Sequence, residues 1–111
     1  MTSVSKQRGS RWELDVVKYL REAGHKYAER AYGAGRRDDK GDVAGFPGWV
    51  FECKNHRAID LAGWMDETDR EKKNARADYG VAIIKRRNKP TKEGYVVMTL
   101  EQFAEILKDL K

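Results

Sequence analysis

The sequence has little of several residue types that define other classes of protein. Its 111 residues include one cysteine and two histidines, so an intramolecular disulfide is impossible and the ligand cluster of a zinc site is missing. No apolar run approaches the roughly 20 residues that a membrane-spanning helix needs. The N-terminal residues lack the basic start and following apolar run that would indicate a signal peptide. We therefore expect a soluble, cytoplasmic protein in a reducing compartment.

Charged residues are abundant and of both signs. The 23 lysine and arginine residues outnumber the 18 aspartate and glutamate residues, which leaves a net charge of +5. Charged residues make up 37% of the chain and hydrophobic residues 40%, which suits one small domain with a modest core and a solvated surface. The positive excess favours a polyanionic partner over an acidic small molecule.

Apolar periodicity and turn residues divide the chain into helices and strands. The expected order is one helix, three strands, one helix, two strands and one helix, after a flexible basic arm over residues 1–9. We expect helices over residues 10–23, 60–77 and 100–110, and strands over 25–32, 42–46, 49–54, 79–84 and 95–99. Residues 10–111 thus predict a single α/β domain with a central mixed sheet of about five strands flanked by helices.

Two of these helices carry apolar residues at helical spacing. The second helix has a stripe that we expect to face the core, with Trp64 and Met65 as alternative candidates for a dimer contact. The members of this stripe are Leu61, Trp64, Met65, Thr68 and Ala75. The last helix follows a candidate N-cap at Thr99. Its expected inward residues are Phe103, Ile106, Leu107 and Leu110.

The stretch over residues 41–54 predicts a β-hairpin that carries charged groups. Glu52 and Lys54 are two residues apart in its second strand, so they share one face, and the small Cys53 between them faces the other way. Asp42 opens the first strand. Two carboxylates and one ammonium at the end of a hairpin are costly to leave unpaired, but they suit a divalent cation and an attacking water.

The turn of this hairpin raises a question of register. Residues 47–48 are Pro-Gly, which suits a type II turn. A strict two-residue loop would pair Val43 with Glu52 and leave Asp42 on the wrong face. A three-residue loop or a bulge at Gly45 would correct this, because glycine tolerates the dihedral angles of a bulge. We therefore predict an irregular hairpin.

Two other glutamates, Glu13 and Glu71, must also be considered as candidates for the site. Glu13 is either the capping-box partner of Ser10 or the first residue of an apolar helix face that turns toward the sheet. Glu71 also lies in a Glu-x-Lys sequence, but in a helical pattern, where residues two apart do not share a face. Strand context therefore distinguishes Glu52 and Lys54 from this second copy.

These residues resemble the PD-(D/E)xK nucleases and, within them, the archaeal and phage Holliday junction resolvases. The resemblance runs over residues 8–13, 41–43 and 52–55, with Gly41 where the signature has proline. It implies a restriction-endonuclease-like core and an endonuclease that resolves four-way DNA junctions by paired phosphodiester hydrolysis. The alternatives are a nickase or a restriction or repair nuclease of the same superfamily, and a non-catalytic basic DNA-binding module.

The resemblance also implies roles for individual residues. Asp42 and Glu52 match the metal-binding carboxylates, and Glu13 matches the glutamate of the first helix. Lys54 matches the catalytic lysine, which would orient a water or stabilise the oxyanion; the alternative is a lysine that simply pairs with Glu52. The backbone carbonyl of Cys53 is a further candidate ligand. One or two Mg²⁺ ions, for which Mn²⁺ could substitute, would suit these hard oxygen atoms and activate the water.

Basic side chains along the chain are candidates for phosphate contacts, which position DNA without reading bases. They are Lys6, Arg8, Arg11, Arg36, Arg37, Lys40, His56, Arg57, Lys85, Arg86 and Arg87. The alternatives are a frayed terminus for residues 1–9, a solvated loop for residues 33–41 and an exposed loop histidine at position 56. Paired cuts on two strands, with one site per chain, imply a homodimer.

Overall fold

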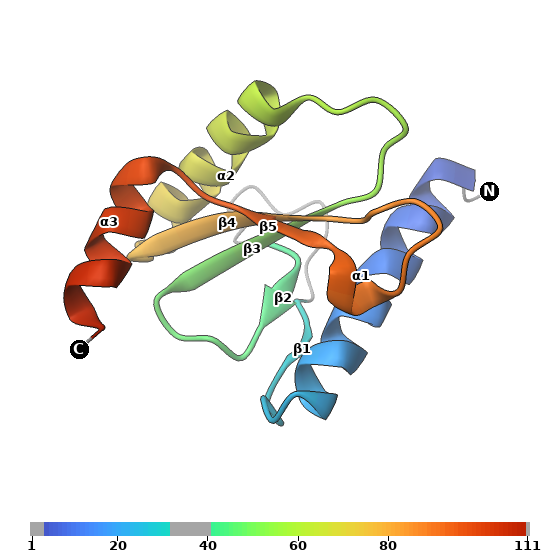
Figure 1. The fold of residues 1–111 in the computed structure, drawn as a ribbon, viewed down its shortest axis with the longest axis horizontal. Helices are drawn as coiled ribbons and strands as arrows, with labels where there is room; N and C mark the ends of the chain where they lie inside the picture. The colour runs from blue at the N-terminus through green and yellow to red at the C-terminus, as the bar shows by residue number, and fades with distance from the viewer. Residues whose placement is uncertain (1–3, 32–40, 111) are drawn as a thin grey trace.

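The computed structural model describes residues 4–31 and 41–110, with side chains from residue 9 onward. A mixed five-stranded sheet in the order β1-β2-β3-β4-β5 forms its centre (Figure 1). The elements are α1 (Val4–Glu22), β1 (Glu29–Arg30), β2 (Val43–Ala44), β3 (Trp49–Lys54), α2 (Leu61–Ala75), β4 (Tyr79–Ile84), the 3₁₀ turn η1 (Thr91–Glu93), β5 (Tyr95–Val97) and α3 (Leu100–Asp109). This confirms the predicted α/β class. None of the helices in the described ranges is long and apolar enough to cross a membrane.

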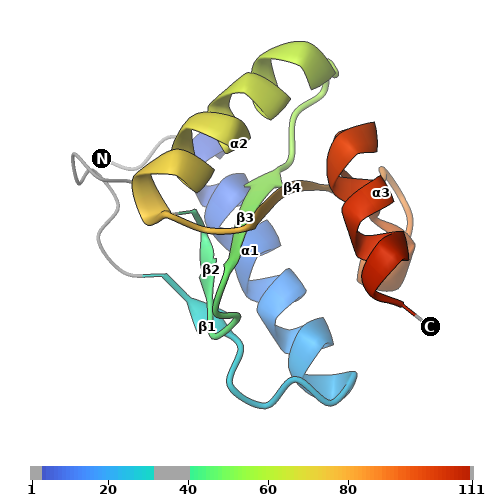
Figure 2. The same cartoon turned by 90° about the vertical axis from the view of Figure 1, so that its left-hand side faces the viewer.

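Helices α1 and α2 cover opposite faces of the sheet (Figure 2). Phe51 and Cys53 of β3 pack in one buried cluster with Trp12 of α1. On the other face, Ala82 of β4 packs with Trp64 of α2. Alternate residues of a strand point to opposite faces, so the sheet has two apolar sides, and each needs a helix to remove it from water.

The hairpin between β2 and β3 is irregular, as the sequence predicts. The chain turns over residues 46–49, where a backbone hydrogen bond of 3.0 Å joins the last residue to the first and Gly48 has the positive φ of a type II turn. Val43 pairs with Phe51, one residue earlier than a regular two-residue hairpin would place its partner. The extra residue lies on the first strand, where Gly45 has φ +102°. This confirms the predicted bulge.

Strands β3 and β4 are parallel and end at the same edge of the sheet. Lys54 pairs with Ile84, and the Lys85 backbone N–H donates to the Lys54 carbonyl at 3.0 Å. Residues 55–57 and 85–87 therefore leave the sheet side by side. The C-terminal edge of a parallel strand pair is where α/β sheets usually bind ligands.

The first helix begins earlier than the sequence predicts. Helix α1 begins at Val4, so residues 4–9 of the expected arm are helical and Ser10 lies inside the helix. Ser10 cannot then be an N-cap, and the capping-box interpretation of Glu13 is wrong. The prediction failed because no proline interrupts residues 4–9, and the single Gly9 costs only about 1 kcal/mol in a helix interior.

The first strand is shorter than predicted. Only Glu29 and Arg30 of the expected strand over residues 25–32 are in β1, and position 32 lies outside the described residues. A turn closed by a hydrogen bond from Ala28 N–H to His25 O precedes it. This turn uses backbone groups that a longer strand would have needed for its ladder.

Helix α2 is close to its predicted bounds, but its inner face differs from the predicted stripe. Asp60 is its N-cap and accepts a hydrogen bond from Gly63 N–H at 3.0 Å. The buried residues of the helix are Trp64, Thr68 and Glu71. Trp64 therefore belongs to the core and not to a dimer surface, while the predicted stripe residue Leu61 is exposed.

Helix α3 presents a different face to the sheet from the one predicted. Thr99 is its N-cap, as expected, with Oγ1 accepting from Gln102 N–H. Phe103, Leu107 and Leu110 are exposed, although they were expected to face inward, and Gln102 is the buried residue. The reason is a specific polar contact between Gln102 and the backbone of β4, which apolar periodicity does not detect.

Candidate metal and nucleic-acid site

Glu52 and Lys54 lie on the face of β3 that α2 covers, as their spacing predicts. Their side chains are 8% and 12% exposed, and Lys54 Nζ lies 3.3 Å from Glu52 Oε1. Neighbouring apolar residues of β3 face the other way, toward α1. A central strand therefore places a carboxylate and an ammonium together in a largely buried position.

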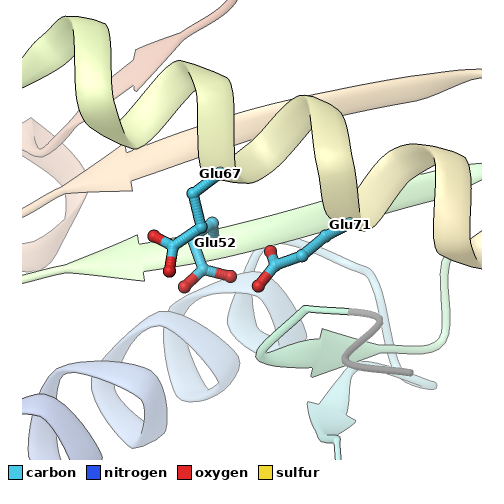
Figure 3. Close-up of side chains that lie close together, drawn as sticks. All are labelled: Glu52, Glu67 and Glu71. Atoms are coloured by element: carbon cyan, nitrogen blue, oxygen red, sulfur yellow. The ribbon is translucent and has the colours of Figure 1, made fainter. Parts of the chain in front are cut away.

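Helix α2 brings two further glutamates to this pair. Glu67 and Glu71 are four residues apart, so they project from the same side of the helix. Lys54 Nζ lies 2.5 Å from Glu67 Oε1, and one oxygen from each of Glu52, Glu67 and Glu71 lies within 4.8 Å of the others. Figure 3 shows the three carboxyl groups side by side, one from β3 and two from α2.

The sequence analysis did not identify either helical glutamate as a neighbour of Glu52. The interpretation of residues 71–73 as a helical segment is correct, since α2 spans Leu61–Ala75. Lys73 is exposed and pairs with Asp69 at 3.0 Å, so it does not share the buried position of Glu71. That interpretation overlooked that Glu71 alone could face the core. The signal that could have found it is the spacing of Trp64, Thr68 and Glu71, which places all three on one helix face.

Burial and neighbouring charge shift the pKa values of this cluster. Burial raises the pKa of Glu52 above its usual value, and the contacts with Glu71 and Lys54 offset this only in part. Burial also opposes the charged form of Lys54, but its hydrogen bond to Glu67 and the nearby Glu52 charge outweigh that effect and raise its pKa. Lys54 is therefore an ammonium at neutral pH, surrounded by more carboxylates than it can neutralise.

Asp42 reaches β3 through its side chain. Its Oδ2 accepts a hydrogen bond of 2.8 Å from the Cys53 backbone N–H, and its own N–H donates to Phe51 O at 2.8 Å. The N–H and C=O of one strand residue face the same neighbouring strand, so the Cys53 carbonyl is also on the Asp42 side. Asp42 thus lies beside the backbone segment that joins Glu52 to Lys54.

Glu13 lies on the other side of the sheet from the α2 glutamates. Its Oε1 is 2.9 Å from Arg30 Nη2, a partner that sequence analysis did not identify. Burial, then the charges of Asp42 and Glu13, raise the pKa of the Cys53 thiol well above its usual value. The thiol is therefore protonated and unreactive at neutral pH.

The structure thus brings only part of the predicted ligand set together. Within the described ranges, the only group of three ligand side chains close enough to hold an ion is Glu52, Glu67 and Glu71. Glu13 and Asp42 are not part of it. The donor atoms of this group are all carboxylate oxygens, which suit Mg²⁺ or Mn²⁺.

Predicted DNA-contacting residues surround the shared edge of β3 and β4. Arg57 and Arg87 are exposed there, Lys85 Nζ lies 5.3 Å from the Trp12 ring centroid, and the His56 ring lies 5.5 Å from that of Trp64. Of the others, Arg86 pairs with Glu93 and Arg11 with Asp15, each at 3.4 Å. Arg36, Arg37 and Lys40 lie outside the described residues, as do the side chains of Lys6 and Arg8.

Comparison of the chain with protein-family models, with curated proteins and with solved structures gives no match. The functional interpretation therefore depends on the geometry of the site and on the resemblance of its residues to a known signature.

Proposed function

We propose that this protein is a metal-dependent DNA endonuclease that resolves four-way junctions by hydrolysing one phosphodiester bond in each of two strands. One observation carries the proposal. Glu52 and Lys54 are held together on one face of β3, 3.3 Å apart, with the Asp42 carboxylate bound to the backbone between them. This is the arrangement that the resemblance to the PD-(D/E)xK nucleases requires of its three signature residues.

The carboxylates of this site would hold the cation. Glu52 Oε2 is buried and has no hydrogen-bond partner, so an oxygen ligand for a hard metal ion is present. A bound Mg²⁺ would lower the pKa of a coordinated water and neutralise charge on the scissile phosphate. Asp42, fixed by the Cys53 amide, is positioned to contribute from the neighbouring strand.

Lys54 would act on the reacting atoms themselves. Its ammonium is fixed by Glu67 and Glu52, so little side-chain entropy remains to be lost when substrate binds. It would orient the attacking water and stabilise the charge that develops on the phosphate oxygens. The water would lose a proton to solvent as its oxygen bonds to phosphorus. The bond from phosphorus to one bridging oxygen would break, and the leaving oxygen would take a proton from solvent.

The basic residues at the edge of β3 and β4 would hold the DNA backbone next to this site. Arg57 and Arg87 are exposed and follow strands that end at the same level. Phosphate contacts of this kind depend on shape and charge and not on base sequence. Resolution of a junction requires two cuts, so the active form would be a homodimer with one site in each subunit.

The decisive test maps Mg²⁺-dependent cuts on a synthetic four-way junction and on linear duplexes of the same arms. The parent protein should cut the junction in two opposed strands and leave the duplexes intact. Glu52→Gln and Lys54→Ala should each lower the cleavage rate at least about 100-fold. Glu101→Gln and Lys108→Ala, which change exposed residues of α3, should cleave like the parent.

Other outcomes would redirect or reject the proposal. Equal cutting of junction and duplex would indicate a nuclease without junction selectivity. Junction binding without any cutting, unchanged by Glu52→Gln, would indicate a DNA-binding module with no catalytic role for the carboxylates. Sedimentation at the assay concentration tests the dimer directly, because a monomer that still makes paired cuts would contradict the two-subunit arrangement.

A further inference from the structure

We propose that α2 supplies ligands to a divalent-cation site, in which Glu67 and Glu71 join Glu52. The ligand set expected from the resemblance uses Asp42 and Glu13 with Glu52, and neither helical glutamate belongs to it. The inference depends on the proposed function for the role of the ion in DNA cleavage. The existence of the site does not depend on cleavage, and binding alone can test it.

The three carboxylates are positioned by regular secondary structure. Glu52 is in the central strand β3, and Glu67 and Glu71 occupy adjacent turns of α2, packed on the same sheet by Trp64. One carboxylate oxygen from each residue lies within 4.8 Å of the other two, and Figure 3 shows the three carboxyl groups close together between β3 and α2. Ligands on such elements need little rearrangement to bind an ion.

A second observation indicates a missing cationic partner. Glu52 is 6% exposed, and its Oε2 has no hydrogen-bond partner. Lys54 contacts the other oxygen of Glu52 and also Glu67, so the ammonium does not satisfy this atom. The contacts of Glu52 with Glu71 and Lys54 offset only part of the cost of its burial, and a buried carboxylate oxygen without a donor adds to that cost. A cation between Glu52 and the α2 carboxylates would remove that cost.

The donor atoms select the type of ion. All three ligands offer carboxylate oxygens, which Mg²⁺ and Mn²⁺ prefer, and protein sites of this kind keep several waters on the ion. The one thiol of the chain, Cys53, faces the opposite side of the sheet with α1. The site therefore lacks the sulfur and imidazole ligands typical of structural zinc.

Binding of Mn²⁺ in the absence of DNA tests the site. Free Mn²⁺ is measured by electron paramagnetic resonance during titration of the full chain at neutral pH. Glu67→Gln and Glu71→Gln should each weaken binding at least about tenfold, since each removes one charged ligand. Asp66→Asn, which changes an exposed carboxylate on the same helix, is the matched control and should bind like the parent.

Asp42→Asn separates the two ligand sets. If Asp42→Asn abolishes Mn²⁺ binding while Glu67→Gln and Glu71→Gln bind like the parent, the α2 site is wrong and the proposed nuclease function stands. If both α2 variants lose binding and the parent cuts no DNA, the site stands and the nuclease function fails. A parent protein that binds no Mn²⁺ at millimolar concentration also overturns the inference.

A measurement on the parent alone guards against variants that do not fold. Mn²⁺ broadens the NMR signals of nearby amides, so the signals of residues 67–71 should disappear at lower Mn²⁺ concentration than those of Glu13 and Arg30. Broadening that is strongest around Glu13 would contradict the α2 site.

Discussion

Glu52 is a carboxylate that the fold holds at an energetic cost. It lies in a central strand, is 6% exposed and has one oxygen without a hydrogen-bond partner. Burial raises its pKa, and the contacts with Glu71 and Lys54 compensate only in part. A residue whose charged form is unfavourable in the folded protein but useful to a bound cation is typical of a functional site.

This cost predicts a pH dependence of stability when metal is removed. A raised pKa in the folded state means that the folded chain binds more protons than the unfolded chain. In EDTA, the contribution of Glu52 to the free energy of unfolding should therefore be lost as pH rises above its ordinary pKa of 4.5. Urea unfolding at a series of pH values measures this.

Glu52→Gln is the variant that isolates the effect. Its free energy of unfolding in EDTA should exceed that of the parent at neutral pH and should fall less as pH rises. Glu101→Gln, at an exposed position of α3, should follow the parent curve. Parallel curves for Glu52→Gln and the parent would show that burial does not penalise this charge.

At the scale of single elements, the bulge at Gly45 sets the geometry of the hairpin. It brings Val43 opposite Phe51 and allows the side chain of Asp42 to reach the Cys53 amide. Gly45 has φ +102°, and a Cβ there would lie 2.2 Å from the Tyr27 carbonyl oxygen. Both facts require glycine at this position.

Gly45→Ala should therefore destabilise the protein and disrupt the candidate site. Gly24 is the matched control, because it has φ +107° but open space around its Cβ position. Gly24→Ala should cost about 1–2 kcal/mol from backbone strain alone, and Gly45→Ala should cost more because of the clash. Thermal or urea unfolding checks this, and equal losses in both variants would argue against a close packing of β2 on residue 27.

A polar contact between α3 and β4 is a second feature that acts at the scale of single elements. Gln102 Oε1 accepts from Gly80 N–H at 2.6 Å, and its Nε2 donates to Gly80 O at 2.9 Å. Strand β5 pairs only with positions 82–84 of β4, so the side-chain amide takes the place of a strand at Gly80. This contact decides which face of α3 is turned inward.

Gln102→Leu should lower the free energy of unfolding by about 1–3 kcal/mol, because it leaves two buried backbone groups of Gly80 without partners. Lys108→Ala on the exposed surface of α3 should change it by less than about 0.5 kcal/mol. Urea unfolding measures both. A Gln102→Leu variant as stable as the parent would show that the amide contact does not orient α3.

At the scale of the whole molecule, the parallel pair β3 and β4 directs charge to one edge. The chain carries a net charge of +5, and the residues that follow both strands include Arg57 and Arg87, which are exposed. The acidic cluster lies in the interior between β3 and α2, close to this edge. A polyanion could therefore be held by the edge next to a site that favours cations.

The double variant Arg57→Ala/Arg87→Ala should weaken binding to a four-way junction and make that binding less dependent on salt. Each lost phosphate contact lowers the slope of log K against log salt by about 0.9 on duplex DNA. Fluorescence anisotropy at several salt concentrations measures the slope. Lys108→Ala should leave the slope unchanged, and an equal effect of that variant would show that binding follows net charge and not this edge.

The local elements of this protein follow from its amino-acid sequence alone. Apolar periodicity and turn chemistry predicted β4 over 79–84, the Thr99 cap and the bulge at Gly45, because each depends on neighbours in the chain. The common face of Glu52 and Lys54 follows in the same way from the two-residue period of a strand.

The contacts between groups that are distant in the chain depend on the tertiary fold. Glu67 and Glu71 joined Glu52 because α2 packs on β3, and Glu13 paired with Arg30 because α1 lies near β1. These contacts join residues that are 15 or more positions apart in the chain, and their geometry depends on how helices pack on the sheet. Periodicity identifies a helix face, but the partner that covers that face is set by the fold as a whole.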